Sequence, residues 1–262
     1  MLKHRRMEAL QVNGVALELS RIAGPEGSRL APVVFLHEGL GSVAMWRDWP
    51  RQVCEATGRA GFVYSRRGYG RSQSIPDVRG ANRLRPDYMH REALDVLPKL
   101  IAQLGVDAPV LLGHSDGGTI ALLYAAHFPV SACVVMAPHV MVEDVSVQSI
   151  EEAKAAYGTT GLRSRLARYH DDVDTAFWQW NDIWLAPSFR NFDIRAECKR
   201  IGAPLLAMQG ADDAYGTLRQ VEEIVPAGPI RREVIAHCGH SPHKDQPEST
   251  LRLVAQFLAG IG

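Results

Sequence analysis

The sequence predicts an α/β fold with a mostly parallel central sheet, flanking helices and an inserted helical lid. Short apolar segments alternate with longer amphipathic ones along most of the chain, a pattern typical of parallel strands connected by helices. Of the 262 residues, 46% are hydrophobic, which is enough for one large buried core. The alternation is interrupted between about His139 and Arg200, where helical segments follow one another without a strand.

The segments expected to be buried strands are short, rich in Val, Leu or Ile, and closed by Gly, Pro, His or Ser. They are Val33–His37, Phe62–Ser65, Val110–Gly113, Ala132–Ala137, Leu205–Gln209 and Arg231–Ile235. Helices are expected between and after them, at Trp46–Thr57, His90–Leu104, Gly118–His127, Leu218–Val225 and Pro247–Ala259. The last helix starts with proline, which the first helical turn tolerates because its N–H has no intrahelical partner.

Three helical segments make up the interruption: Val147–Tyr157, Leu162–Tyr169 and Asp174–Asp182. Helices inserted between two strands are a common way to cover an active site at the strand ends. We therefore expect a core of residues 1–138 and 201–262 and a lid of residues 139–200.

The lid is rich in aromatic side chains, namely Phe177, Trp178, Trp180, Trp184 and Phe189. Such side chains line apolar acyl or aryl pockets, and they serve equally well to pack a lid against a core. The candidate substrate contacts in this segment are Trp178, Trp180, Asn181 and Trp184.

The charge balance, the cysteines and the lengths of the apolar segments argue against several classes of function. Lys plus Arg equals Asp plus Glu at 29 each, and this balance argues against nucleic acid or an acidic membrane surface as the main partner. The four cysteines are scattered, as in a cytoplasmic protein with reduced thiols. No apolar segment approaches a membrane span, and no apolar stretch follows the basic N-terminus as in a secretory signal. The expected partner is a small-molecule substrate, and a homodimer is left open.

A candidate nucleophile lies in the middle of the chain. Residues 110–119 predict an apolar strand, the turn Gly113-His114-Ser115-Asp116-Gly117 and the start of a helix. A serine at a sharp strand-to-helix turn holds its Oγ above the sheet edge, and the flanking glycines remove side chains that would collide. The helix N-terminus directs N–H groups toward a developing oxyanion.

A candidate base and acid follow in the order Ser, Asp, His. Asp213 comes after the strand Leu205–Gln209, and His240 comes after the strand Arg231–Ile235. Loops at neighbouring strand ends can bring a carboxylate to an imidazole, which a serine needs to take its proton. Asp212 is the alternative acid, and Glu143 or Asp144 after an earlier strand is a more remote one.

These motifs together resemble the α/β-hydrolase superfamily, and the resemblance covers nearly the whole chain. Gly210-x-x-Asp213 is similar to the family's acid loop, and Gly239-His240 to its histidine loop. The resemblance implies that Asp213 orients His240 and that His240 is the base. Ser65 to Ser72 resembles the family's D-x-R-G-x-G-x-S turn, with Ser65 in place of the usual Asp and a structural role implied.

The same resemblance implies which residues form the oxyanion loop. Val33 to Ser42 is similar to the family's strand and His-Gly loop, which implies Gly39 as one N–H donor and Asp116 as the other. Glu38 stands where the family usually has glycine. A carboxylate facing the oxyanion would oppose catalysis, so we expect Glu38 to pair with Arg66 or Arg67, or to contact a polar substrate group or a water.

A metal interpretation of His237, His240 and His243 is disfavoured, because Gly239 and Pro242 interrupt any shared helical face. No cofactor is expected, and we expect His243 to support its loop by hydrogen bonding.

A serine nucleophile excludes the carboxylate-nucleophile branches and leaves acyl transfer to water. The pattern most resembles small esterases and enol-lactonases, which implies hydrolysis of a small carboxylic ester, lactone or thioester through an acyl-enzyme on Ser115. Two alternatives stay open: C–C bond hydrolysis of a ring-cleavage diketone, and a non-catalytic ligand-binding protein on the same scaffold.

Overall fold

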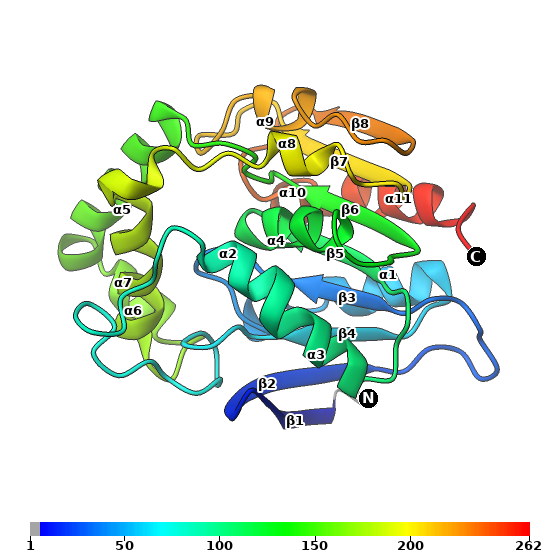
Figure 1. Ribbon diagram of the computed structural model, residues 1–262, viewed down its shortest axis with the longest axis horizontal. Helices are drawn as coiled ribbons and strands as arrows, with labels where there is room; N and C mark the ends of the chain where they lie inside the picture. Colours follow the sequence, from blue (N-terminus) through cyan, green and yellow to red (C-terminus); the bar gives the residue numbers. More distant parts are fainter. Residues whose placement is uncertain (1–5) are drawn as a thin grey trace.

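A computed structural model describes residues 6–262, and its centre is an eight-stranded sheet. The strands in chain order are β1 (Arg6–Val12), β2 (Val15–Ile22), β3 (Val33–Leu36), β4 (Gly61–Tyr64), β5 (Val110–His114), β6 (Ala132–Met136), β7 (Leu205–Gly210) and β8 (Ile230–Ile235). Their order across the sheet is β1-β2-β4-β3-β5-β6-β7-β8. The strands from β4 to β8 in this order run parallel, and the β1–β2 hairpin pairs antiparallel to the edge at β4 (Figure 1).

Helices connect the strands. Those of the core are η1 (Ala44–Trp46), α1 (Trp49–Thr57), α2 (Tyr88–Arg91), η2 (Glu92–Val96), α3 (Leu97–Gln103), α4 (Asp116–Ala125), α9 (Arg219–Glu222), α10 (Pro242–Asp245) and α11 (Pro247–Leu258). Those between β6 and β7 are α5 (Asp144–Thr159), α6 (Leu162–Leu166), α7 (Val173–Trp184), η3 (Pro187–Phe189) and α8 (Arg195–Cys198). No described helix is both long and apolar enough to cross a lipid bilayer.

Alternate side chains of the central strands belong to two separate hydrophobic clusters, one on each face of the sheet. On β3, Val33 and Phe35 join the cluster under α1 and α11, whereas Val34 and Leu36 join the cluster under α3 and α4. Because both faces are covered, these strands are apolar throughout instead of alternating with polar residues. α4 is buried over its whole length, which fixes the helix that follows the candidate nucleophile.

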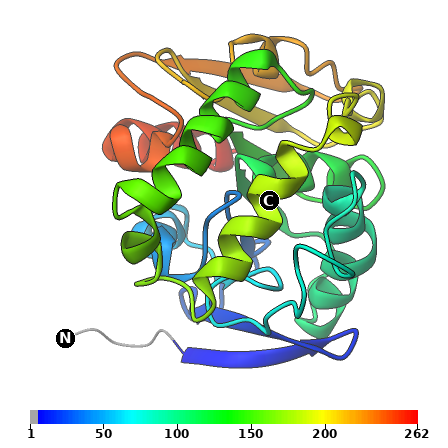
Figure 2. The ribbon, with the colours of Figure 1, turned by 90° about the vertical axis from the view of Figure 1, so that its left-hand side faces the viewer.

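The helices between β6 and β7 lie at one end of the sheet (Figure 1). Figure 2, seen from that end, shows α5 and α7 crossing in front of the strand ends. The expected fold class is therefore confirmed, including the inserted helices. The division into a core and a lid as separate domains stays a prediction.

The six expected strands are all present, with ends that differ by at most one residue. The expectation was incomplete at the N-terminus, where it lacked β1 and β2. These strands are joined at Asn13 and Gly14, both with positive φ (53° and 75°), the conformation that a two-residue hairpin turn requires.

Candidate active site

Ser115 lies between β5 and α4 in a strained backbone conformation, with φ 53° and ψ −121°. A non-glycine residue rarely adopts such angles, and the surrounding packing must hold it there. The motif glycines allow this packing. A Cβ on Gly113 would collide with the carbonyl of Gly117, and a Cβ on Gly117 would collide with the carbonyl of Leu36 at the end of β3.

One chain of hydrogen bonds joins Ser115, His240 and Asp213. The Nε2 atom of His240 lies 2.9 Å from the Oγ of Ser115. On the other side of the ring, Nδ1 lies 3.0 and 2.9 Å from the two carboxylate oxygens of Asp213. The structure thus brings the three predicted residues together from the ends of β5, β7 and β8.

Asp213 is anchored independently of His240. The side chain of Gln209 donates to one carboxylate oxygen at 2.6 Å, and the N–H of Tyr215 donates to the other at 2.8 Å. Burial alone would raise the pKa of Asp213, but the hydrogen bond and charge of His240 outweigh it and hold the pKa below its ordinary value. Asp213 is therefore ionised and fixed in place at neutral pH.

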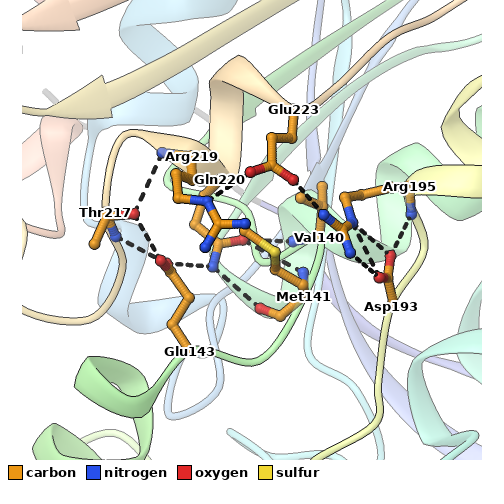
Figure 3. A network of polar contacts seen from close by, with 9 residues as sticks. All are labelled: Val140, Met141, Glu143, Asp193, Arg195, Thr217, Arg219, Gln220 and Glu223. Atoms are coloured by element: carbon orange, nitrogen blue, oxygen red, sulfur yellow. Dashed lines mark hydrogen bonds and ion pairs between the residues drawn. The ribbon is translucent and has the colours of Figure 1, made fainter.

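The alternative acids lie elsewhere. Glu143 accepts hydrogen bonds from the N–H and Oγ of Thr217 and from Gln220, as Figure 3 shows. Asp144 pairs with Arg190 on the surface. Asp212 is exposed, and His240 contacts its neighbour Asp213 instead.

The predicted oxyanion donors flank the serine. Asp116 is the first residue of α4, where an N–H has no carbonyl partner within the helix. Gly39 lies against the indole of Trp180, and a Cβ there would collide with that ring. Glycine at this position therefore lets the backbone approach the cavity closely. That these two N–H groups bind an oxyanion stays a prediction.

The buried carboxylate of Asp116 is compensated on the side away from the serine. It accepts a hydrogen bond from the hydroxyl of Tyr88 at 2.7 Å and lies 3.7 Å from the guanidinium of Arg66. Tyr88 in turn accepts from the indole N–H of Trp184 at 3.1 Å. Burial raises the pKa of Asp116, against the opposing effects of Arg66 and Tyr88. The negative charge next to the nucleophile is thus balanced by groups that the sequence pattern did not identify.

The expected pairing of Glu38 with Arg66 or Arg67 is wrong. The Glu38 carboxylate pairs with Lys244 of α10 at 2.8 Å, and its other oxygen lies 3.5 Å from Nδ1 of His114. Arg66 instead donates to the backbone carbonyl of Glu38 at 3.1 Å. Burial alone would raise the pKa of Glu38, but Lys244 and His114 outweigh it and hold the pKa well below its ordinary value. Glu38 is therefore a fixed negative charge.

A cavity of about 200 Å³ opens at Ser115 and His240. Its other lining residues are Glu38, Gly39, Leu40, His114, His139, Ile150, Trp180, Trp184, Tyr215 and Ser241. Glu38 and two of the predicted tryptophans, Trp180 and Trp184, thus line the same cavity as the nucleophile.

Two predicted substrate contacts lie away from this cavity. The ring of Trp178 is covered by the guanidinium of Arg79, 3.8 Å from the ring centroid. Asn181 is buried and donates from its side chain to the carbonyl of Ile150 at 3.1 Å, which ties α7 to α5. Both residues therefore hold the helices between β6 and β7 instead of lining the cavity.

Among the lining residues that were not predicted from the sequence, two carry rings beside His240. His139 follows β6, and its ring centroid lies 5.5 Å from that of His240. Burial, together with the charge of His240, lowers the pKa of His139 to about 3, so it is neutral under ordinary conditions. The ring of Tyr215, two residues after Asp213, lies 4.8 Å from that of His240. Both residues follow the ends of predicted strands, and this position is the sequence signal that could have identified them.

His243 does not support its loop by hydrogen bonding as expected. Within residues 6–262, neither ring nitrogen has a hydrogen-bond partner. The ring instead packs against Trp46 and Trp49, with centroids 4.7 and 5.5 Å apart. Among the same residues, no group of three His, Cys, Asp or Glu side chains is arranged to hold a metal ion.

Comparison with known proteins agrees with this geometry. Residues 33–253 match the model of the alpha/beta hydrolase family. The chain belongs to that family. Proline iminopeptidase of Lactobacillus delbrueckii subsp. lactis is 36% identical over 108 residues, which are 41% of this chain and 35% of the relative. The match thus spans about a third of that relative's length.

Two further similarities cover most of the chain. The sn-1-specific diacylglycerol lipase of Mus musculus is 23% identical over 88% of this chain and 81% of its own length. The crystal structure of the enol-lactonase from Burkholderia xenovorans LB400 superposes with a TM-score of 0.74, at 18% identity, over 96% of this chain and 99% of the other. At such identities the structural likeness shows the fold alone.

Proposed function

We propose that this hydrolase cleaves a small carboxylic ester, lactone or thioester through an acyl-enzyme on Ser115. The observation that carries the proposal is the unbroken hydrogen-bond chain from Asp213 through His240 to the Oγ of Ser115, which opens into a cavity. A serine hydroxyl is a weak nucleophile until a neighbouring base takes its proton, and this arrangement supplies that base.

The reaction proceeds in two acyl transfers. Ser115 Oγ attacks the substrate carbonyl while Nε2 of His240 takes its proton, and Asp213 stabilises the imidazolium that forms. The N–H groups of Gly39 and Asp116 stabilise the oxyanion. His240 then protonates the leaving group, and the acyl group stays on Ser115. In the second transfer His240 takes a proton from the attacking water and then returns it to the Oγ of Ser115 as the ester bond to the serine breaks, which releases the carboxylic acid and restores the enzyme.

The cavity supports a small substrate. Its volume of about 200 Å³ is below the 300–1,000 Å³ common for sites of drug-sized ligands. Leu40, Ile150, Trp180 and Trp184 give it apolar walls suited to a short acyl chain or ring. Glu38 is ionised but paired with Lys244, so it adds a compensated charge to this otherwise apolar lining.

The named relatives are compatible with ester chemistry. By their names, the enol-lactonase and the diacylglycerol lipase act on cyclic and linear esters, whereas the proline iminopeptidase acts on peptides. An ester, lactone or thioester carries a better leaving group than an amide, and the small cavity favours a compact substrate.

The test is turnover of a panel of aryl esters, lactones and acyl thioesters by the wild-type protein and by Ser115→Ala. We expect hydrolysis of short-chain members by wild type alone. A fluorophosphonate probe should label wild type and leave Ser115→Ala unlabelled. A folded wild-type protein that resists the probe would indicate a non-catalytic binding protein. Turnover of a vinylogous diketone without any ester would assign the triad to C–C bond hydrolysis.

A further inference from the structure

A second cavity, of about 310 Å³, is larger than the one at Ser115 and shares no lining residue with it. Its walls come from the β1–β2 hairpin, from the 66–69 turn, from the segment 82–96 and from Gln179 of α7. Ser115 and His240 do not line it. Its volume falls within the range of ordinary small-molecule sites.

Two of the lining residues, Arg66 and Arg67, each carry one buried nitrogen that has no hydrogen-bond partner among the described residues. Arg66 is 5% exposed, and its Nη1 atom has no hydrogen-bond partner among residues 6–262. The same holds for the buried Nε atom of Arg67. A buried guanidinium N–H without an acceptor is unfavourable, because the group has lost water and gained nothing in return. An anion bound in the cavity would lie next to both guanidinium groups.

The charges around this cavity favour an anion. Arg66 pairs with Asp116 at 3.7 Å and Arg91 pairs with Asp87 at 2.8 Å, but Arg67 has no ion pair within the described part of the chain. The carboxylate among the lining residues is Glu92, which accepts a hydrogen bond from Tyr64 at 2.7 Å. Burial raises the pKa of Glu92, against the opposing charge of Arg66, so this carboxylate is a weaker competitor for Arg66 than an ordinary glutamate would be.

The rest of the cavity is apolar. Its walls include Val12, Val15, Leu17, Ile75, Leu84 and Val96. A guanidinium at one side and aliphatic walls at the other suit an amphipathic anion better than an inorganic one.

We propose that this second cavity binds a small monocarboxylic acid, with its carboxylate on Arg66 and Arg67 and its aliphatic chain against the apolar walls. Carboxylates form bidentate hydrogen bonds with the planar guanidinium, which a neutral ligand does not. The site is separate from the catalytic cavity and does not depend on the proposed hydrolysis. It adjoins the catalytic centre all the same, because Arg66 also contacts Asp116 and the carbonyl of Glu38.

Calorimetric titration of the full chain with hexanoate tests the proposal, since hexanoate needs no turnover. We expect hexanoate to bind more tightly than hexan-1-ol. Arg67→Met should weaken hexanoate binding about tenfold by removing a charge-assisted hydrogen bond. Val96→Trp should weaken it similarly by filling the cavity. Arg85→Met is the matched control, because Arg85 is exposed and outside the cavity, and it should bind as wild type does.

Equal affinity for hexanoate and hexan-1-ol, or no binding of either, would overturn the proposal. So would hexanoate binding that survives both cavity substitutions, because the ligand would then lie in the catalytic cavity. Thermal unfolding of each variant checks that it is folded. If Val96→Trp does not fold, Arg67→Met against Arg85→Met decides the matter alone.

Discussion

Replacing Asp213 by asparagine removes the negative charge behind His240 and leaves the shape of the site nearly unchanged. Nδ1 of His240 lies within 3.0 Å of both oxygens of Asp213, so the amide oxygen of asparagine can still accept its proton. Tyr215 N–H donates to that same oxygen. The new amide NH2 would face Gln209, whose Oε1 has no partner within residues 6–262 and is free to accept after a flip.

The expected loss therefore comes from charge. A carboxylate and an imidazolium 2.9 Å apart attract each other by about 6 kcal/mol at an effective dielectric constant of about 20. His240 is partly exposed, which screens part of that attraction. At about 1.4 kcal/mol per decade in rate, kcat should fall by roughly 10³ to 10⁴.

The assay is kcat for a short-chain aryl ester, with active sites counted by fluorophosphonate labelling. Asp212→Asn is the matched control, since the neighbouring carboxylate is exposed and should change kcat by less than about twofold. A variant Asp213→Asn that keeps more than about a tenth of wild-type kcat would refute this account. A larger effect from Asp212→Asn would move the orienting role to that residue.

Three further outcomes are expected. Trp180→Ala should raise kcat/KM for a hexanoate ester relative to an acetate ester about tenfold, because the ring closes one wall of the catalytic cavity; an unchanged chain-length profile contradicts this. Gln220→Leu should lower the free energy of unfolding by about 2–4 kcal/mol in urea titrations, since it leaves the buried N–H of Val140 without a partner and removes one donor from the carboxylate of Glu143 (Figure 3). Gln148→Leu on the surface should change it little. Burial lowers the pKa of His139 in the folded protein to about 3. Below about pH 6.5 the unfolded chain therefore binds more protons at this residue than the folded chain does. The free energy of unfolding should then fall between about pH 6.5 and about pH 3 by up to about 1.4 kcal/mol per pH unit. His139→Phe should flatten that slope, and urea midpoints equal at pH 7.5 and 5.5 would refute the argument.

The juxtaposition of Ser115, His240 and Asp213 could be predicted because the position of each depends on local sequence and on chain order. Ser115 is marked by glycines that the turn requires for steric reasons. His240 and Asp213 follow apolar strands that lie side by side in a parallel sheet, so their loops meet at one edge. In each case a few neighbouring residues determine the position of the side chain.

The hairpin at the sheet edge was missed although its turn is local. Asn13-Gly14 is a strong hairpin signal, but the flanking strands are partly exposed and mix charged and apolar residues. β2 buries Leu17 and Leu19 together with Glu18 and Ser20, so its sequence does not show a simple alternation. The buried Glu18 is explained by its tertiary partners, since the hydroxyl of Ser65 donates to its carboxylate at 2.7 Å and the N–H of Arg71 donates to it at 3.1 Å.

The aromatic residues of α7 show how helical spacing decides which side chains of a helix line the cavity. Trp180 and Trp184 are four residues apart and share one face of the helix, and both line the catalytic cavity. Trp178 and Asn181 lie off that face and contact Arg79 and α5 instead. The composition of the segment indicated a pocket wall, whereas the period of 3.6 residues decides which side chains reach it.

The partners of the acidic residues near the oxyanion loop could not be predicted, because they are distant in sequence. Lys244 reaches Glu38 from 206 residues away, and Tyr88 reaches Asp116 from another segment of the core. These contacts explain how a site that stabilises negative charge tolerates two carboxylates: each is neutralised by a cation or a hydroxyl before substrate arrives. The Glu38 pair has a further consequence, because His114 beside it also lies 2.6 Å from the carbonyl of His240 through Nε2. The unusual glutamate therefore helps to fix the backbone of the histidine that the proposed reaction uses as its base.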